Sequence, residues 1–134
     1  TSIGGEWAEK GQKRFASDVL PYKPDVLFID YALNDMGIGL ERSKVAWSKM
    51  IEEALANNIK VILVTPSPDQ RQDITDPNNK LALHASQIRE LALKYQVGLA
   101  DPFAEFQKIQ KEQGNVKDVM SHVNHPNQKG HDII

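Results

Sequence analysis

Residues 24–35, Pro-Asp-Val-Leu-Phe-Ile-Asp-Tyr-Ala-Leu-Asn-Asp, decide the fold class of this chain. The part over 25–31 is nearly continuously hydrophobic, as in a strand that is covered on both faces of a parallel sheet. Asn34 and Asp35 follow it directly, and ligands of open parallel sheets bind beyond the carboxyl ends of the strands. The stretch therefore predicts a buried parallel strand with functional polar groups at its end.

Further strands and helices are predicted on both sides of this stretch. Apolar runs at 59–64 and 97–100 predict two more strands. Helical spacing of apolar residues predicts helices over 6–20, 41–57, 81–95 and 102–113, with Asp101 as N-cap and Gly114 at the end of the last one. Residues 115–127 are expected to be loop. This alternation indicates the α/β class with a parallel sheet.

Length and composition limit the function classes. The 134 residues, 40% hydrophobic and 25% charged, fit a single globular domain over 1–134. A net charge of -2 gives no basic surface for nucleic acid. No apolar run approaches the roughly 20 residues that cross a bilayer, so no membrane span is expected. The absence of cysteine leaves the compartment open, cytoplasmic or secreted.

Three positions are candidates for chemistry. His125 precedes Pro126, which restricts the local backbone and helps to aim the imidazole as a base. Asn34 has an amide that can donate to an oxyanion, and Gly4-Gly5 permits a turn with an exposed N–H group. Each also has a structural interpretation, as a turn, a cap or a packed histidine. His84, within an apolar helical stripe, is expected to be a packing residue.

Together these residues resemble the SGNH, or GDSL-type, hydrolase family. Gly4-Gly5-Glu6 with Gly11 is similar to its second block, with Gly5 as the backbone donor. Residues 24–35 are similar to the third, with Asn34 as the side-chain donor and Ala32 in place of the usual glycine. Residues 122–127 and Gly130-His131 are similar to the fifth, with His125 as the catalytic base.

The resemblance implies a three-layer α/β/α, flavodoxin-like parallel sheet and a serine ester hydrolase. Its substrate would be a small ester, either an acylated sugar or a lipid ester. The reaction would need no metal and no organic cofactor. The 66–79 stretch, long and polar, is expected to be a loop that walls a pocket or lies on the surface.

Two departures from the family pattern have consequences. No Gly-Asp-Ser segment occurs, so we expect the nucleophile and the first two strands to precede Thr1, and this chain alone to be inactive. His122 occupies the position of the usual acid. We therefore expect either a Ser-His dyad, which we favour, or an acid supplied by Asp118.

Three other interpretations remain open at this stage. Asp30 and Thr65 resemble positions of a receiver-like signalling domain. His122, His125 and His131 lie close enough in sequence to suggest a metal site. The missing acid would also suit a non-catalytic binding module.

The expected order of strands leaves the edge beside 25–31 unpaired. Open strand edges pair with other chains. We therefore expect the preceding segment, or another copy of the chain, to pair with this edge.

Overall fold

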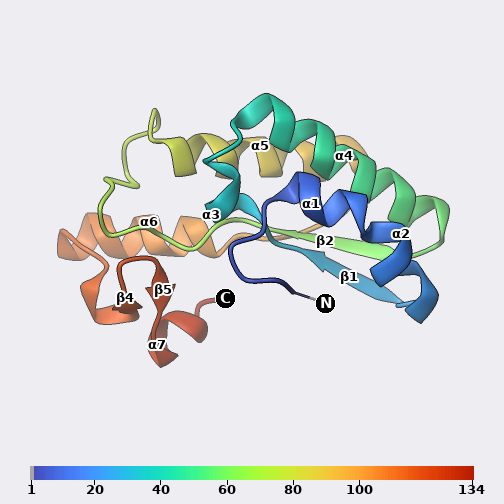
Figure 1. The fold of residues 1–134 in the computed structure, drawn as a ribbon. Coiled ribbons are helices and arrows are strands. Elements are labelled where there is room, and N and C mark those ends of the chain that lie inside the picture. The colour runs from blue at the N-terminus through green and yellow to red at the C-terminus, as the bar shows by residue number, and fades with distance from the viewer. Residues whose placement is uncertain (1) are drawn as a thin grey trace.

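The computed structural model describes residues 2–134 and contains a three-stranded parallel sheet (Figure 1). The strands are β1 (Val26–Ile29), β2 (Lys60–Val64) and β3 (Gly98–Ala100), in the order β1-β2-β3. Phe28 is in register with Ile62, which is in register with Gly98. All three predicted strands are confirmed, each a little shorter than its apolar run.

Helices connect and flank these strands. They are α1 (Ala8–Lys13), α2 (Phe15–Asp18), η1 (Leu20–Tyr22), α3 (Ala32–Asp35), α4 (Leu40–Ala56), α5 (Lys80–Tyr95), α6 (Pro102–Gln113), η2 (Lys117–Val119) and α7 (Gln128–His131). Asp101 caps α6 by accepting a hydrogen bond from the N–H of Ala104 at 3.3 Å, and Gly114 ends that helix, as predicted. No helix within residues 2–134 is long and apolar enough to cross a membrane.

The helix expected over 6–20 is wrong as a single element. It is divided at Arg14 into α1 and α2. Gly11 lies inside α1 and is buried. A Cβ at this position would lie 2.2 Å from the Tyr31 hydroxyl, so glycine is needed there for packing.

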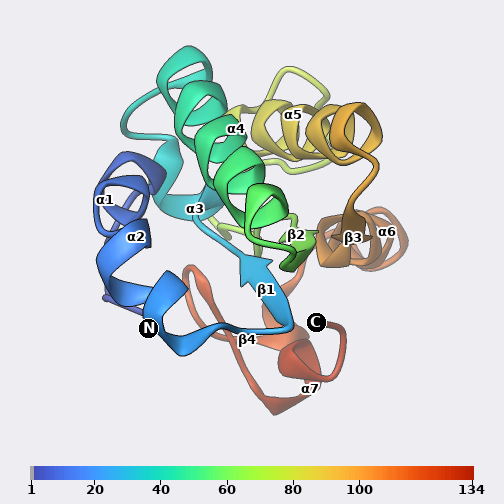
Figure 2. The ribbon, with the colours of Figure 1, turned by 90° about the vertical axis from the view of Figure 1, so that its right-hand side faces the viewer.

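Helices α4 and α5 cover one side of the sheet, and the segment with β4 and α7 lies on the other side (Figure 2). Buried apolar residues fill the space between the sheet and helices α4 and α5. Among them are Ile29, Trp47, Ile51, Val61, Leu63, Ile88 and Leu91. A second cluster joins α6 to the start of α5 and to the segment after α6, with Phe103, Phe106, Leu81, Ile74 and Val119. Leu55, near the end of α4, is 42% exposed.

The expectation that both faces of β1 are covered is wrong for the described residues. Ile29 is buried, but Phe28 is 62% exposed and Val26 is 44% exposed. Leu99 on the other edge strand, β3, is 41% exposed but is in register with the buried Leu63, so it belongs to the opposite face. The sheet therefore has one buried face and one face with exposed apolar side chains.

The segment 115–127, expected to be loop, contains a short antiparallel hairpin. Its strands are β4 (Met120–His122) and β5 (His125–Pro126), with His122 opposite His125. The predicted base is thus held in regular structure.

Candidate active site

The structure places Asn34 against the residue that follows Gly5. Asn34 lies on α3, directly after β1. Its Nδ2 donates a hydrogen bond to the carbonyl oxygen of Glu6 at 3.0 Å. Gly5, the preceding residue, has a φ of 71°, in the left-handed region that favours glycine. The side-chain amide of Asn34 is therefore held next to the turn at Gly5 by its bond to Glu6, just after β1.

Glu6 is anchored by its side chain as well as by its carbonyl. Its carboxylate is bound by Arg14, with Nη2 2.6 Å from Oε2. Hydrogen bonding to Glu6 raises the pKa of Arg14. The turn at Gly5 is thus followed by a residue that is fixed from two sides.

Asp35, next to Asn34, is fully buried and accepts three hydrogen bonds. Oδ1 accepts from the backbone N–H of Ala8 at 2.7 Å. Oδ2 accepts from the Ser43 hydroxyl at 2.8 Å and from the Trp47 indole N–H at 2.7 Å. This carboxylate joins α1, α3 and α4.

His125 is exposed on β5, and neighbouring segments hold its hairpin in place. Gln70 donates its backbone N–H to the carbonyl of Val123 at 2.7 Å, and its Nε2 to the carbonyl of His122 at 3.0 Å. The long 66–79 loop therefore supports the hairpin that carries the predicted base.

The chain that follows His125 is fixed by Asn127. Its Nδ2 donates to the carbonyl of Asp118 at 2.9 Å, and its Oδ1 caps α7 by accepting from the N–H of Gly130 at 3.0 Å. A Cβ on Gly130 would lie 2.2 Å from the carbonyl oxygen of Val119. Glycine at this position lets α7 pack closely against the hairpin.

The residues proposed to orient His125 make no hydrogen bond to its ring. The ring of His122 lies 6.0 Å from that of His125, centroid to centroid. Asp118 is exposed on η2, and no hydrogen bond or ion pair joins its carboxylate to His125 within the described chain. Among residues 2–134, no three His, Asp or Glu side chains gather as metal ligands do, so the site of His122, His125 and His131 does not form.

A hollow of about 310 Å³ lies beside Asn34. It is lined by Ser2, Ile3, Glu6, Phe28, Asp30, Tyr31 and Asn34. Although Asp30 remains partly exposed there, desolvation by its surroundings raises its pKa to about 6, and the charge of Asp35 adds to this effect. The hollow contains the proposed side-chain donor but not His125.

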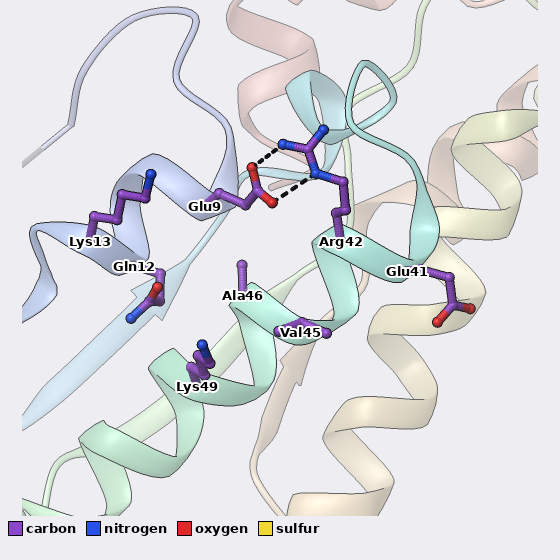
Figure 3. Close-up of a pocket in the computed structure, with 8 residues that line it drawn as sticks. All are labelled: Glu9, Gln12, Lys13, Glu41, Arg42, Val45, Ala46 and Lys49. Carbon is purple, nitrogen blue, oxygen red and sulfur yellow. Dashed lines mark hydrogen bonds and ion pairs between the residues drawn. The ribbon is translucent and has the colours of Figure 1, made fainter.

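A larger groove, of about 510 Å³, separates α1 from α4 (Figure 3). Glu9 of α1 and Arg42 of α4 point toward each other across it and form an ion pair, with Nε 2.8 Å from Oε1 (Figure 3). None of the predicted site residues lines this groove.

Thr65 and His84 have structural roles, one in joining two elements and the other in packing. The Thr65 hydroxyl donates to Asp101 at 2.8 Å and accepts from the N–H of Phe103 at 3.1 Å, so it joins β2 to α6 and gives no support to a receiver-like domain. His84 is only 3% exposed, which confirms it as a packing residue.

Sequence reasoning missed the supporting roles of Glu6, Asp35 and Gln70. Asp35 was visible only as half of an Asn-Asp pair, which is common in turns and caps. Ser43 and Trp47, eight and 12 residues later, are its partners. A buried tryptophan needs an acceptor for its indole N–H, which was the available signal.

Comparisons with known proteins bear on the family and the fold of the chain. The sequence profile of the GDSL-like lipase/acylhydrolase family matches residues 1–133. The chain is 40% identical over 75 residues to the uncharacterized lipoprotein YqeF of Bacillus subtilis (strain 168). This match covers 49% of this chain and 30% of that protein. The chain thus spans less than a third of this curated relative.

Solved structures show the same fold. The acetyl xylan esterase AlAXEase has a TM-score of 0.83 at 21% identity, covering 99% of this chain and 73% of that one. A catalytic mutant of Axe2, an acetylxylan esterase from Geobacillus stearothermophilus, has a TM-score of 0.84 at 20% identity, covering 98% of this chain and 65% of that one. The predicted α/β fold class is confirmed.

Proposed function

Because the chain belongs to the GDSL-like lipase/acylhydrolase family, we propose that it forms part of a serine ester hydrolase. In this proposal His125 is the general base. The N–H of Gly5 and the side-chain amide of Asn34 stabilise the oxyanion.

The contact between Asn34 and Glu6 is the observation that carries the proposal. One Nδ2 hydrogen is used at 3.0 Å to the carbonyl of Glu6, which fixes the direction of the amide. The second Nδ2 hydrogen is left for a ligand. A preorganised donor of this kind contributes about 3 to 4 kcal/mol to transition-state stabilisation.

The reaction has two steps. A serine oxygen attacks the ester carbonyl carbon while His125 takes the serine proton, and the alcohol leaves with that proton when the C–O bond breaks. Water then attacks the acyl-enzyme, His125 takes the water proton and returns it to serine, and a carboxylic acid is released. No serine of this chain lies in a Gly-Asp-Ser segment, so the proposal assigns the nucleophile to sequence outside residues 1–134.

Esterase assays on the protein that includes its nucleophile segment test this proposal. We expect hydrolysis of a short-chain aryl ester, with kcat reduced at least about 100-fold by His125→Ala and about 100-fold by Asn34→Ala. The matched controls His131→Ala and Asn78→Ala, both at exposed positions, should keep kcat within about threefold of wild type. Full activity in His125→Ala would exclude the proposed base.

A non-catalytic binding module is the second candidate, supported by the exposed His122 at the position of the usual acid. It predicts no ester cleavage by the wild-type protein. It also predicts that His125→Ala leaves ligand binding intact.

We propose a Ser-His dyad rather than an Asp118 triad. The support is that Asp118 contributes its backbone carbonyl, not its carboxylate, to the contacts around the hairpin. Asp118→Asn should therefore keep kcat within about threefold. In a triad, the corresponding substitution lowers kcat by about 10⁴-fold.

A further inference from the structure

Two consecutive residues of α3 hold two points of the segment that follows Gly5. Asn34 binds the carbonyl of Glu6 at 3.0 Å, and Asp35 binds the N–H of Ala8 at 2.7 Å. Helices α1, α3 and α4 lie together around these contacts (Figure 1). The turn at Gly5 is therefore positioned relative to α3 rather than by its own local sequence.

Within the described residues, Asp35 Oδ1 is the only acceptor for the N–H of Ala8, the first residue of α1. Trp7, the N-cap residue, makes no side-chain cap. Ala8 is fully buried, and a buried N–H group without an acceptor is costly. Without Asp35, the segment between Gly5 and Ala8 would have to move to find another partner.

We propose that Asp35 is a positioning residue of the oxyanion hole, which holds Ala8 through Oδ1 and thereby keeps the Gly5 N–H aligned with the Asn34 amide. The proposal rests on the function proposed above. It assigns Asp35 no contact with substrate.

The donors around Asp35 make the proposal testable. The N–H groups of Ala8 and Trp47 can only donate, whereas the Ser43 hydroxyl can also accept. A carboxylate satisfies all three, one oxygen facing Ala8 and the other facing Ser43 and Trp47. Asparagine has a single acceptor oxygen, so Asp35→Asn cannot serve both N–H groups.

Removing the competing donor should restore the Ala8 contact. In the double variant Asp35→Asn with Trp47→Phe, the amide oxygen can face Ala8 while its NH₂ group donates to the Ser43 hydroxyl. Trp47→Phe alone leaves Oδ1 on Ala8 and serves as the matched control for lost packing at α4.

Kinetics of the protein with its nucleophile segment give the first measurement. We expect Asp35→Asn to lower kcat about 100-fold, because a small displacement of the donors misaligns the hole, with KM changed less than about threefold. Trp47→Phe should keep kcat within about threefold, and the double variant should recover at least about tenfold over Asp35→Asn. A kcat of Asp35→Asn within threefold of wild type, or a double variant no better than it, would overturn the proposal.

Amide hydrogen exchange at Ala8 gives a measurement that does not depend on activity. Protection should be present in wild type and Trp47→Phe, lost in Asp35→Asn and regained in the double variant. Equal exchange in wild type and Asp35→Asn would contradict the positioning role. If the exchange pattern holds but the wild-type protein cleaves no ester, the proposed function fails instead.

Discussion

Two buried ionisable side chains, His84 and Asp69, differ in how folding changes their proton affinity. His84 lies on α5 at 3% exposure, and burial lowers its pKa while the charge of Asp35 partly opposes this. Asp69 is also buried, but hydrogen bonds from Arg71 lower its pKa. Burial therefore favours the neutral form of His84, whereas pairing favours the charged form of Asp69.

The histidine environment predicts a pH-dependent stability. The pKa of His84 in the folded state lies below the unfolded value of 6.5, so the unfolded state binds a proton first as the pH falls. The contribution of His84 to the free energy of unfolding is therefore present above pH 6.5 and is lost at lower pH. We expect His84→Gln to flatten the decline in unfolding free energy between pH 7.5 and 5.5, by at most about 1.4 kcal/mol per pH unit. Urea denaturation at several pH values measures this, with the exposed His131→Gln as control. A slope that is the same in His84→Gln and in wild type would be evidence against it.

At the residue scale, the sequence allowed site residues to be proposed but did not indicate their hydrogen-bond partners. Asn34, Gly5 and His125 were proposed from their residue types and spacing, and their roles stay predictions. The roles of Glu6 and Asp35 depend on hydrogen bonds to residues 28 and 27 positions away, which no local pattern encodes.

Among the secondary-structure elements, the β4–β5 hairpin is stabilised by hydrogen bonds from neighbouring segments. It belongs to a separate two-stranded sheet and is held by Gln70 from one side and by Asn127 and α7 from the other. An isolated two-stranded hairpin is marginal in water. The position of His125 therefore depends on these flanking contacts.

Close packing of α7 makes Gly130 a sensitive position. In Gly130→Ala, the new Cβ would meet the Val119 carbonyl oxygen at 2.2 Å and the Pro126 Cβ at 2.7 Å, so α7 or β5 must shift. We expect a loss of about 1 to 3 kcal/mol in unfolding free energy and a fall in kcat of about 100-fold. Thermal unfolding and esterase kinetics measure both effects. Lys129→Ala, at an exposed position of the same helix, should change neither, and a similar loss in both variants would refute the steric explanation.

Long periodic elements could be predicted and short ones could not. Helices α4 and α5 and all three strands follow from apolar spacing, with ends that differ by a few residues. The hairpin was expected to be loop because its residues are mostly polar and its pairing depends on Gln70 and Asn127. The division of the first helix at Arg14 is not encoded in the apolar spacing; the Arg14 side chain pairs there with Glu6 and, one turn later, with Asp18.

At the scale of the whole molecule, the sheet formed by the described residues has an open edge at β1 and a face with exposed apolar side chains. The strand order places β1 at the edge, and Phe28 and Val26 expose much of their side chains there. Contiguous exposed apolar surface promotes association. The pairing of this edge with the preceding segment or with a second copy stays a prediction.

A polypeptide of residues 1–134 alone should therefore self-associate. We expect Phe28→Lys to shift it toward monomer in sedimentation velocity, because a charge on the open face opposes association. Leu93 on α5 is more exposed, at 80%, but lies away from this face, so Leu93→Lys should leave the association unchanged. A monomeric, cooperatively unfolding wild-type polypeptide would contradict this prediction.

The remote cap of α1 also bears on the order of folding. This helix has six residues, no side-chain cap of its own and a first N–H group that is satisfied by Asp35, 27 residues away. Helices this short are unstable in isolation. We therefore expect α1 to become stable only after α3 and α4 have assembled around Asp35.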